Sequence, residues 1–254
     1  MLWHGRGPAT PLLGILVLSV TGCETPPRSP GERADGSIVR MSDDFEFDAP
    51  SDAWTFRTPT LWRITSEGER RFLQMAFPPQ RPLLPGIRRP QEYALYNRFE
   101  FRSFSLACYM RIDRDPQVRG RDACIIFGRQ DNTHFYYVHL SNVSDALHNN
   151  IIRVDGETRE SLLPADEQRR PAITDRQWHR VDLVRDVDSG SIRVWVDLDL
   201  ATPQEPPLFE VTDRTYEWGF VGLASFDDHA SFGRFGIDGQ ARSPATPAFT
   251  DGTP

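Results

Sequence analysis

Residues 128–156 read GRQDNTHFYYVHLSNVSDALHNNIIRVDG. Two apolar runs, 135–141 and 150–155, flank a stretch rich in Asn, Ser and Asp, and this pattern is typical of two strands joined as a β-hairpin. The unusual aromatic and polar residues of the hairpin are Tyr137, His139, His148, Asn149 and Asn150. The hairpin is therefore the first place in which a functional site is expected.

Short alternating apolar runs bounded by Gly, Pro, Asp or Asn recur through residues 40–240, and helical periodicity is nearly absent. The runs are 44–47, 61–65, 72–77, 93–96, 103–112, 123–129, 135–141, 150–155, 179–185, 192–198, 220–225 and 232–237. Parallel neighbours need long crossover connections, usually helices, so these strands should pair antiparallel. The sequence therefore predicts one all-β domain built as an antiparallel sandwich or barrel.

Alternation between apolar and polar residues assigns faces to the strands outside the hairpin. The residues predicted to face the core are Phe104, Leu106, Cys108, Met110, Ile112, Val181, Leu183, Ile192, Val194, Val196 and Leu198. Tyr109, Arg111 and Trp195 then lie on the opposite face. A turn through residues 188–190 would place Trp195 across from Asp182. An outward-facing tryptophan indicates either a covering loop or a ligand that stacks on the ring.

The same rule assigns faces within the hairpin. The predicted inward residues are Tyr136, Val138 and Leu140 on the first strand and Asn150, Ile152 and Val154 on the second. This assignment turns Tyr137 and His139 to the other face, with Ile151 and Arg153 beside them. The hairpin is thus predicted to present an aromatic face next to an arginine.

Short motifs spread over residues 43–238 carry a resemblance to a known fold. They are FSL at 104–106, IIFGRQD at 125–131, FYYV at 135–138, WHRV at 178–181, IRVWVD at 192–197, GFVGLA at 219–224 and FGRF at 232–235. In this order they resemble the concanavalin A-like lectins and glucanases, in particular the laminin-G-like and 3-keto-disaccharide hydrolase-like modules of bacterial exported proteins. The resemblance implies an antiparallel two-sheet jelly-roll sandwich over residues 40–240, in which the concave sheet handles sugars.

A saccharide is the ligand that the outward-facing residues suit best. Aromatic faces stack on pyranose rings, while Arg, Asn and His side chains hydrogen-bond to hydroxyl groups. The predicted ligand-binding residues are Tyr109, Arg111, Tyr137, His139, His148, Asn149, Arg153 and Trp195. They predict a carbohydrate-binding domain that holds a saccharide or polysaccharide on one sheet face. The alternative is that Tyr137 and His139 belong to an ordinary solvent-exposed sheet.

The sequence favours a binding module slightly over a catalyst. The carboxylate motif of retaining glucanases, Glu-x-Asp-x-x-Glu, begins at Glu46 and stops after Asp48. His139 as general base, with Asp182 or Asp131 nearby, is the best catalytic candidate because histidine titrates near neutral pH. Two other functions therefore stay open: a glycoside-processing enzyme of the 3-keto-disaccharide hydrolase type, and a laminin-G-like structural or adhesion module.

Calcium is the cofactor that the acidic loops could hold. Asp131, Asp227 and Asp228 offer hard oxygen ligands, and the resemblance implies that such a domain can hold a structural calcium ion. No His-x-x-x-His motif and no cysteine pair of zinc-binding spacing occurs, so a zinc site is not predicted.

Cys108 and Cys124 lie in consecutive predicted strands, where a hairpin would allow a disulfide; two buried free thiols would give the same pattern.

The first residues follow the pattern of an export signal, with an apolar run over 11–20 and small residues before Cys23. About ten apolar residues are too few to cross a bilayer. Residues 1–22 resemble a bacterial lipoprotein signal that leaves Cys23 lipidated, whereas an ordinary signal peptide would differ mainly in its cleavage. Residues 23–39 predict a flexible tether and 241–254 a disordered tail, because both are rich in Pro, Ser and charge.

Charge limits the partners. The net charge of −7 argues against nucleic acid, since phosphate binding needs a basic face. We expect an exported monomer, lipid-anchored to the bacterial cell envelope, whose only contact with the membrane is the anchor.

Overall fold

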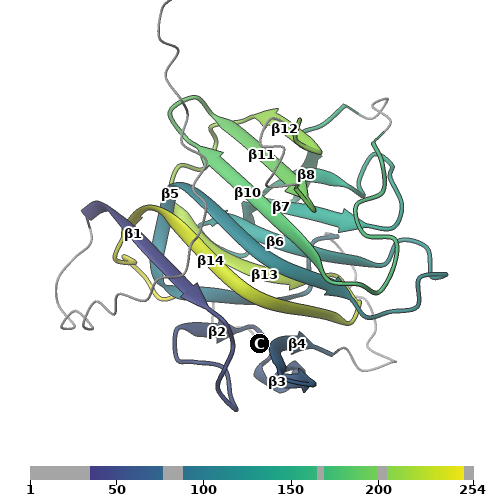
Figure 1. Cartoon of the computed structure of the whole chain (residues 1–254). Helices are drawn as coiled ribbons and strands as arrows, with labels where there is room; N and C mark the ends of the chain where they lie inside the picture. The colour runs from purple at the N-terminus through teal and green to yellow at the C-terminus, as the bar shows by residue number, and fades with distance from the viewer. Residues whose placement is uncertain (1–34, 77–87, 165–168, 199–204, 249–254) are drawn as a thin grey trace, which may run out of the picture.

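The computed structural model describes residues 35–76, 88–164, 169–198 and 205–248, where the strands pair antiparallel throughout (Figure 1). The strands are β1 (Asp35–Asp43), β2 (Trp54–Phe56), β3 (Trp62–Glu67), β4 (Arg70–Met75), β5 (Glu92–Ile112), β6 (Asp122–Arg129), β7 (His134–Ser141), β8 (Asn150–Asp155), β9 (Thr158–Ser161), β10 (His179–Asp186), β11 (Ser191–Val196), β12 (Phe209–Thr212), β13 (Gly219–Ser225) and β14 (Ala230–Arg242). One short 3-10 helix, η1 (Pro59–Leu61), precedes β3. Within the described ranges, no helix has the length and apolar character that a membrane span requires.

Strand β5 belongs to both halves of the fold. Its first part pairs with β13, from which β6, β7, β8 and β9 follow in order; we call this the β6 half. Its second part pairs with β14 and β10, from which β11 and β12 follow, and β14 also pairs with β1; we call this the β10 half. The two halves pack face to face, because the rings of Phe104 on β5 and Phe127 on β6 lie 6.3 Å apart although these strands are not paired. The predicted all-β, antiparallel two-sheet sandwich is therefore confirmed.

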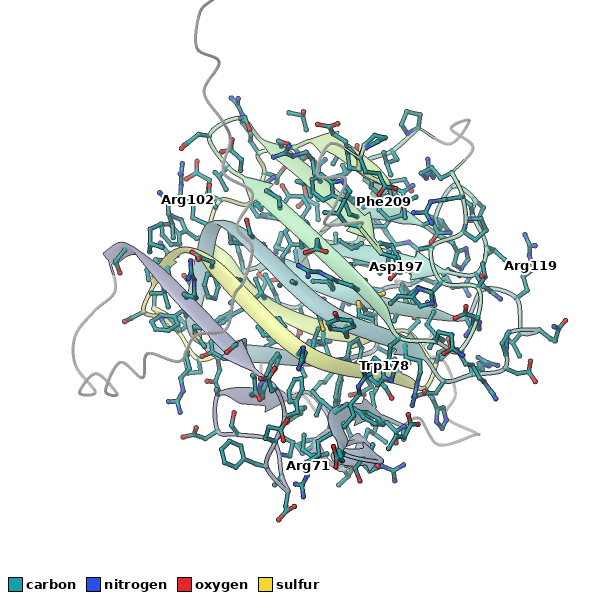
Figure 2. All side chains as sticks on the ribbon, viewed as in Figure 1. Arg71, Arg102, Arg119, Trp178, Asp197 and Phe209 are labelled. Atoms are coloured by element: carbon teal, nitrogen blue, oxygen red, sulfur yellow. The ribbon has the colours of Figure 1, made fainter. Side chains whose placement is uncertain are left out.

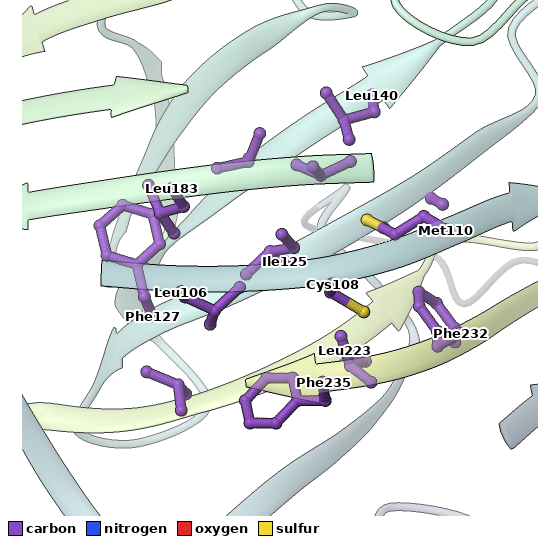
Figure 3. Packing of buried hydrophobic residues seen from close by; sticks show 14 of the residues in the cluster. Leu106, Cys108, Met110, Ile125, Phe127, Leu140, Leu183, Leu223, Phe232 and Phe235 are labelled. Atoms are coloured by element: carbon purple, nitrogen blue, oxygen red, sulfur yellow. The ribbon is translucent and has the colours of Figure 1, made fainter. Parts of the chain in front are cut away.

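The hydrophobic core fills the space between the halves (Figure 3). Residues of both halves that meet there are Leu106, Cys108, Met110, Ile125, Phe127, Leu140, Leu183, Leu223, Phe232 and Phe235. Full burial of one such leucine or phenylalanine contributes roughly 1.5–3 kcal/mol. The inward faces predicted for β5, β10 and β11 are confirmed within these strands, because strict alternation left a polar face outside on each of them. The prediction is wrong for Leu198, which lies beyond the end of β11 and is only partly buried, because Asp197 has a positive φ and ends the alternation.

Some strand boundaries differ from the predictions. The runs 93–96 and 103–112 form the single strand β5, and the run 44–47 follows β1 without being a strand. Strands β2, β9 and β12 are three or four residues long, too short to show alternation. Strand β1 reaches into the segment predicted as a tether, and it pairs with β14, which runs beyond residue 240. The predicted signal peptide, Cys23 and residues 249–254 lie outside the described residues.

The two cysteines remain apart. Cys108 and Cys124 are both free and buried, so the disulfide alternative is wrong and the free-thiol alternative is confirmed. No hairpin joins β5 to β6: Cys108 points into the core between the halves, whereas Cys124 lies on the outer face of the β6 half. Burial raises the pKa of both thiols.

Strand β8 shows the reverse of its predicted faces. Ile151 lies in the core, while Ile152 and Val154 lie on the outer face with Tyr137, which pairs with Ile152 in the register of β7 and β8. The strand is apolar on both faces, and alternation cannot assign the faces of such a strand. Arg153 consequently turns to the core side of the sheet, at its edge.

Candidate functional site

The predicted ligand-binding residues do not share one face. Tyr109 and Trp195 lie on the outer face of the β10 half, since their neighbours in β5 and β11 alternate into the core. Tyr137 and His139 lie on the outer face of the β6 half, where both are buried; Tyr137 lies in a hydrophobic cluster on this face, so its predicted ligand contact is wrong. The core separates these two faces, so the prediction of a single platform is wrong.

The outer face of the β10 half carries a hollow of about 340 Å³ beside Trp178, the Trp178 hollow. It is lined by Asp44, Glu46, Glu69, Arg70, Arg71, Tyr109, Trp178, Gly233 and Arg234; Figure 2 shows Trp178 and Arg71 on this part of the molecule. Arg111 lies with its guanidinium 4.8 Å from the Trp178 ring and is paired with Glu67. Trp195 is held on the same face, where its Nε1 donates to the carbonyl of Glu205 over 2.9 Å.

The predicted catalytic pair of His139 with Asp182 is also wrong. Asp182 lies opposite Trp195, as predicted, but this places it on the β10 half, where both its carboxylate oxygens accept hydrogen bonds from Arg180. Asp131 lies in the turn between β6 and β7, at the far end of β7 from His139, where its carboxylate pairs with His134.

Arg153 is tied to Asp213 at the edge of the core. The Asp213 carboxylate, 9% exposed, also accepts hydrogen bonds from the Tyr136 hydroxyl and, over 2.8 Å, from the backbone N–H of Thr215. Burial alone would raise the pKa of Asp213, but these hydrogen bonds and the charge of Arg153 outweigh burial and hold the pKa below its ordinary value. Arg153 is thus a structural residue.

Replacing Asp213 with alanine should lower the free energy of unfolding by about 2–3 kcal/mol at pH 7, because buried partners lose their acceptor. A carboxyl whose pKa is lowered by folding stabilises the protein above its unfolded pKa of about 3.9, and this stabilisation disappears as the pH falls. The deficit of the variant, measured by urea unfolding, should therefore shrink from pH 7 to pH 3.5. Asp52→Ala removes an 86% exposed ion-pair partner and should leave stability nearly unchanged at both pH values. A deficit of equal size at both pH values would contradict the ionic role.

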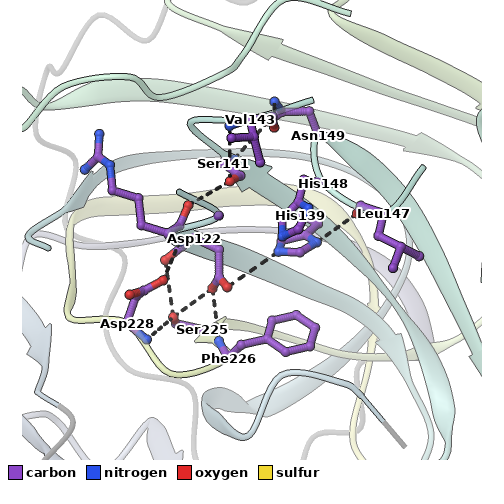
Figure 4. Close-up of polar contacts among 12 residues, drawn as sticks. Asp122, His139, Ser141, Val143, Leu147, His148, Asn149, Ser225, Phe226 and Asp228 are labelled. Atoms are coloured by element: carbon purple, nitrogen blue, oxygen red, sulfur yellow. Dashed lines mark hydrogen bonds and ion pairs between the residues drawn. The ribbon is translucent and has the colours of Figure 1, made fainter. Parts of the chain in front are cut away.

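The hairpin around His139 lines a second hollow, of about 140 Å³, which we call the His139 hollow. Its lining residues are Arg88, Gln91, Gly120, Asp122, His139, Leu147, His148, Arg159, Phe226 and Asp227. It lies on the outer face of the β6 half, at the end of β7 that is followed by the 142–149 loop (Figure 4). Of the predicted ligand-binding residues, His139 and His148 line it.

His139 is fixed by its backbone and aromatic neighbours. Its Nδ1 atom lies 2.9 Å from the carbonyl oxygen of Leu147, and its ring stacks on Phe226 with the ring centres 5.0 Å apart. The ring of His148 lies 4.8 Å from it. His148 is itself held by Asp145, whose pKa is about 2: burial opposes this shift, but backbone N–H groups of the loop stabilise the carboxylate.

Three carboxyl groups gather beside His139. The Oδ1 atom of Asp122 accepts hydrogen bonds from the Ser225 hydroxyl and the backbone N–H of Phe226, at 2.8 and 3.0 Å (Figure 4). Asp228 accepts from the backbone N–H of Asp122 and pairs with Arg114. Burial and the neighbouring Asp122 charge raise the pKa of Asp228 to about 6, and the same two causes raise the pKa of Asp227. Two of these carboxyl groups, Asp122 and Asp227, line the His139 hollow.

The predicted calcium ligands are divided between two places. Asp227 and Asp228 follow β13 and lie beside Asp122, which begins β6. Asp131 lies beyond the other end of β6. The Asp131 carboxylate is already used by the backbone and side chain of Thr133. Asp131, Asp227 and Asp228 therefore do not form one calcium site, although the described residues do contain groups of metal-ligand side chains.

Asn149 is structural and is not open to a ligand. It is fully buried, and its side chain accepts from the backbone N–H of Ser141 and donates to the carbonyl of Val143. Sequence reasoning also missed Asp122 and Phe226. One signal was present: Asp122 is two residues before Cys124, which puts both side chains on the same face of a strand that begins after a polar loop.

The fold is similar to that of solved lectin structures. No protein-family model matches the chain, and no curated protein matches it. Among solved structures, the acidic lectin of winged bean in complex with methyl-α-D-galactose is similar, with a TM-score of 0.54 and 10% identity over 81% of this chain and 99% of the lectin. Basic winged bean lectin with Tn-antigen has a TM-score of 0.51 and 12% identity, over 82% and 100% of the two chains.

A carbohydrate-binding module, CBM66 of Bacillus subtilis, is also similar. Its TM-score is 0.50, with 13% identity over 72% of this chain and 93% of the module. At these identities the likeness concerns the fold, and the site must be argued from the residues of this chain.

Proposed function

We propose that this domain binds a saccharide in the His139 hollow. The observation that carries the proposal is the half-buried ring of Phe226, which stacks on His139 at a hollow whose other walls are carboxylate, imidazole and guanidinium groups. An apolar ring face beside several hydrogen-bonding groups is the combination that a pyranose ring and its hydroxyls require. The concanavalin A-like fold, shared with sugar-binding proteins, supports this class of ligand.

The walls of the hollow suggest how a sugar would be held. Asp227 is exposed and can accept hydrogen bonds from hydroxyl groups, while Arg159, whose guanidinium lies 5.9 Å from the Phe226 ring, can donate them. A volume of about 140 Å³ is small for a ligand site, so the hollow suits one sugar unit of a longer chain.

Replacing Phe226 with alanine should weaken saccharide binding about tenfold, since loss of one stacking contact is worth about 1–1.5 kcal/mol. A glycan array identifies an oligosaccharide, and calorimetry with that oligosaccharide compares the variants. Phe47→Ala is the matched control, because Phe47 is 70% exposed and lies outside both hollows. It should bind like the wild type.

The Trp178 hollow provides the competing location. Tyr109→Ala changes that hollow alone, and it should leave affinity unchanged if the sugar lies beside Phe226. Loss of binding in Tyr109→Ala with full binding in Phe226→Ala would contradict the proposed site. No saturable binding to any saccharide on the array would contradict the function itself.

We also propose that the domain is lipid-anchored to the bacterial cell envelope through Cys23. The apolar run over 11–20 and the small residues before Cys23 support this. Expression in a bacterial host with a radiolabelled fatty acid should label the wild-type chain and place it in the membrane fraction. Cys23→Ser should abolish the label and release the protein, and a labelled Cys23→Ser chain would contradict lipidation at this residue.

A further inference from the structure

His139 and Asp122 face each other at the floor of the His139 hollow without a hydrogen bond between them. His139 is only 3% exposed, and its Nε2 atom has no hydrogen-bond partner. This atom lies 3.6 Å from Oδ2 of Asp122, which is longer than the roughly 2.7–3.2 Å of an N–H···O hydrogen bond (Figure 4). Leaving a buried polar atom without a partner costs about 1–3 kcal/mol.

The hydrogen bond of Nδ1 determines whether Nε2 of His139 carries a hydrogen or a free lone pair. Nδ1 lies 2.9 Å from the carbonyl oxygen of Leu147, and a carbonyl can only accept, so the hydrogen is on Nδ1. In the neutral imidazole, Nε2 then directs a lone pair toward the carboxylate of Asp122. A bond from the second ring nitrogen to a backbone carbonyl is also how proteins usually orient a histidine that ligates a metal.

A third donor lies beside this pair. Cys124 is opposite His139 in the register of β6 and β7 and two residues after Asp122, so all three side chains share the outer face of the β6 half. The ligand atoms of Asp122, Cys124 and His139 lie within 4.8 Å of one another, and all three residues are buried.

We propose that Asp122, Cys124 and His139 bind a divalent transition-metal cation of the zinc class, with the remaining coordination position open to the His139 hollow. Zinc lies about 2.0–2.2 Å from nitrogen and oxygen ligands, so a separation of 3.6 Å between them corresponds to an angle of roughly 110–130° at the metal, near the tetrahedral value. Thiolate and imidazole ligands favour zinc over calcium.

The surroundings support the ligands. The hydrogen bonds from Ser225 and Phe226 hold Oδ1 of Asp122 and leave Oδ2 directed at His139. Binding converts the Cys124 thiol to a thiolate, and the released proton goes to solvent, so affinity should fall at low pH. The inference does not depend on saccharide binding, although a metal at this position would face any sugar in the hollow.

Calorimetry on the full chain, stripped with a chelator and titrated with zinc chloride alone, tests the proposal. We expect a single site with micromolar or tighter affinity. Cobalt(II) in place of zinc should give tetrahedral visible bands and a sulfur-to-cobalt charge-transfer band from Cys124. Asp122→Asn preserves the acceptor for Ser225 and Phe226 yet removes the charge, and it should lower affinity by about 100-fold or more.

Cys124→Ser should lower zinc affinity similarly and remove the charge-transfer band. Cys108→Ser, which changes a buried thiol in the core between the two halves, should leave both unchanged. Zinc should raise the unfolding temperature of the wild type and of Cys108→Ser. If Asp122→Asn does not fold, Cys124→Ser with its spectrum decides the question.

The proposal would be overturned by an absence of zinc binding in the wild type, by unchanged binding in Cys124→Ser, or by calcium binding in place of zinc. Loss of binding in His179→Gln would also overturn it, because that partly buried histidine lies between the exposed carboxylates of Asp175 and Asp197 and could collect zinc at the surface. Saccharide titrations with zinc-loaded and chelator-treated protein separate the two proposals. Zinc binding without saccharide binding contradicts only the proposed function.

Discussion

Replacing Arg121 with methionine is expected to lower the free energy of unfolding by about 3–5 kcal/mol. The Arg121 side chain is fully buried, and its two terminal nitrogens donate to backbone carbonyls of two separate segments. The acceptors are Ile112, Arg114, Ile173 and Asp175, at 2.9, 3.2, 3.3 and 2.6 Å. One guanidinium therefore joins the end of β5 to the segment before β10.

The loss of unfolding free energy in Arg121→Met arises from the backbone carbonyl groups that no longer have a hydrogen-bond donor. Methionine fills much of the space but donates no hydrogen bond, so buried carbonyl groups lose their partners, each at about 1–3 kcal/mol before relaxation. Relief of the buried charge offsets part of this, since burial also lowers the pKa of Arg121. A domain stable by about 5–15 kcal/mol would lose a large share of its stability.

Urea unfolding measures the effect as a lower midpoint at an unchanged slope. Arg119→Met is the matched control: it makes the same change at an exposed position two residues away, and it should alter stability by less than about 0.5 kcal/mol. A stability of Arg121→Met within 1 kcal/mol of the wild type would show that water satisfies these carbonyls equally well.

The fold could be predicted where the sequence alternates strictly. In β5 and β11, polar residues between apolar ones mark which side faces the core, and the structure agrees. In β8 the run Ile151, Ile152 and Val154 is apolar on both faces, so the register alone decides which side each takes. Alternation also does not reveal which half a strand joins, so the sequence could not decide between a disulfide and two free thiols for Cys108 and Cys124.

The position of the candidate site could be predicted from the sequence, but most of the residues that form it could not. The hairpin around His139 does line a hollow, because its unusual polar residues mark a surface that is not simple core. Its partners come from distant segments: Phe226 follows β13, and the carboxylate of Asp122 reaches His139 through the register of β6 and β7. Arg121 shows the same limit, since all 29 basic residues are arginine and nothing in the sequence marks the one that is buried.

Asn149 is the other position at which a single substitution should be severe. It is fully buried with φ at 53°, a left-handed conformation that asparagine tolerates better than most residues. Its side chain accepts from the backbone N–H of Ser141 over 2.9 Å and donates to the carbonyl of Val143 over 2.5 Å (Figure 4). Asn149→Ala removes both hydrogen bonds and adds backbone strain, so we expect a loss of about 3–4 kcal/mol.

Two further variants at this position separate the contributions. Asn149→Gly removes the same hydrogen bonds but accepts positive φ, so it should be more stable than Asn149→Ala by about 1 kcal/mol. Asn149→Asp keeps the acceptor for Ser141 and sets a carboxylate against the Val143 carbonyl, so its deficit should shrink in acid as the carboxyl is protonated and can donate. Urea unfolding of the three variants at pH 7 and pH 4 tests this order.

If Asn149→Ala and Asn149→Gly are equally stable, the left-handed backbone carries no strain, and the role of Asn149 reduces to its two hydrogen bonds. If all three retain wild-type stability, the 142–149 loop is not held by Asn149, and the ligand-binding role predicted for this residue becomes open again.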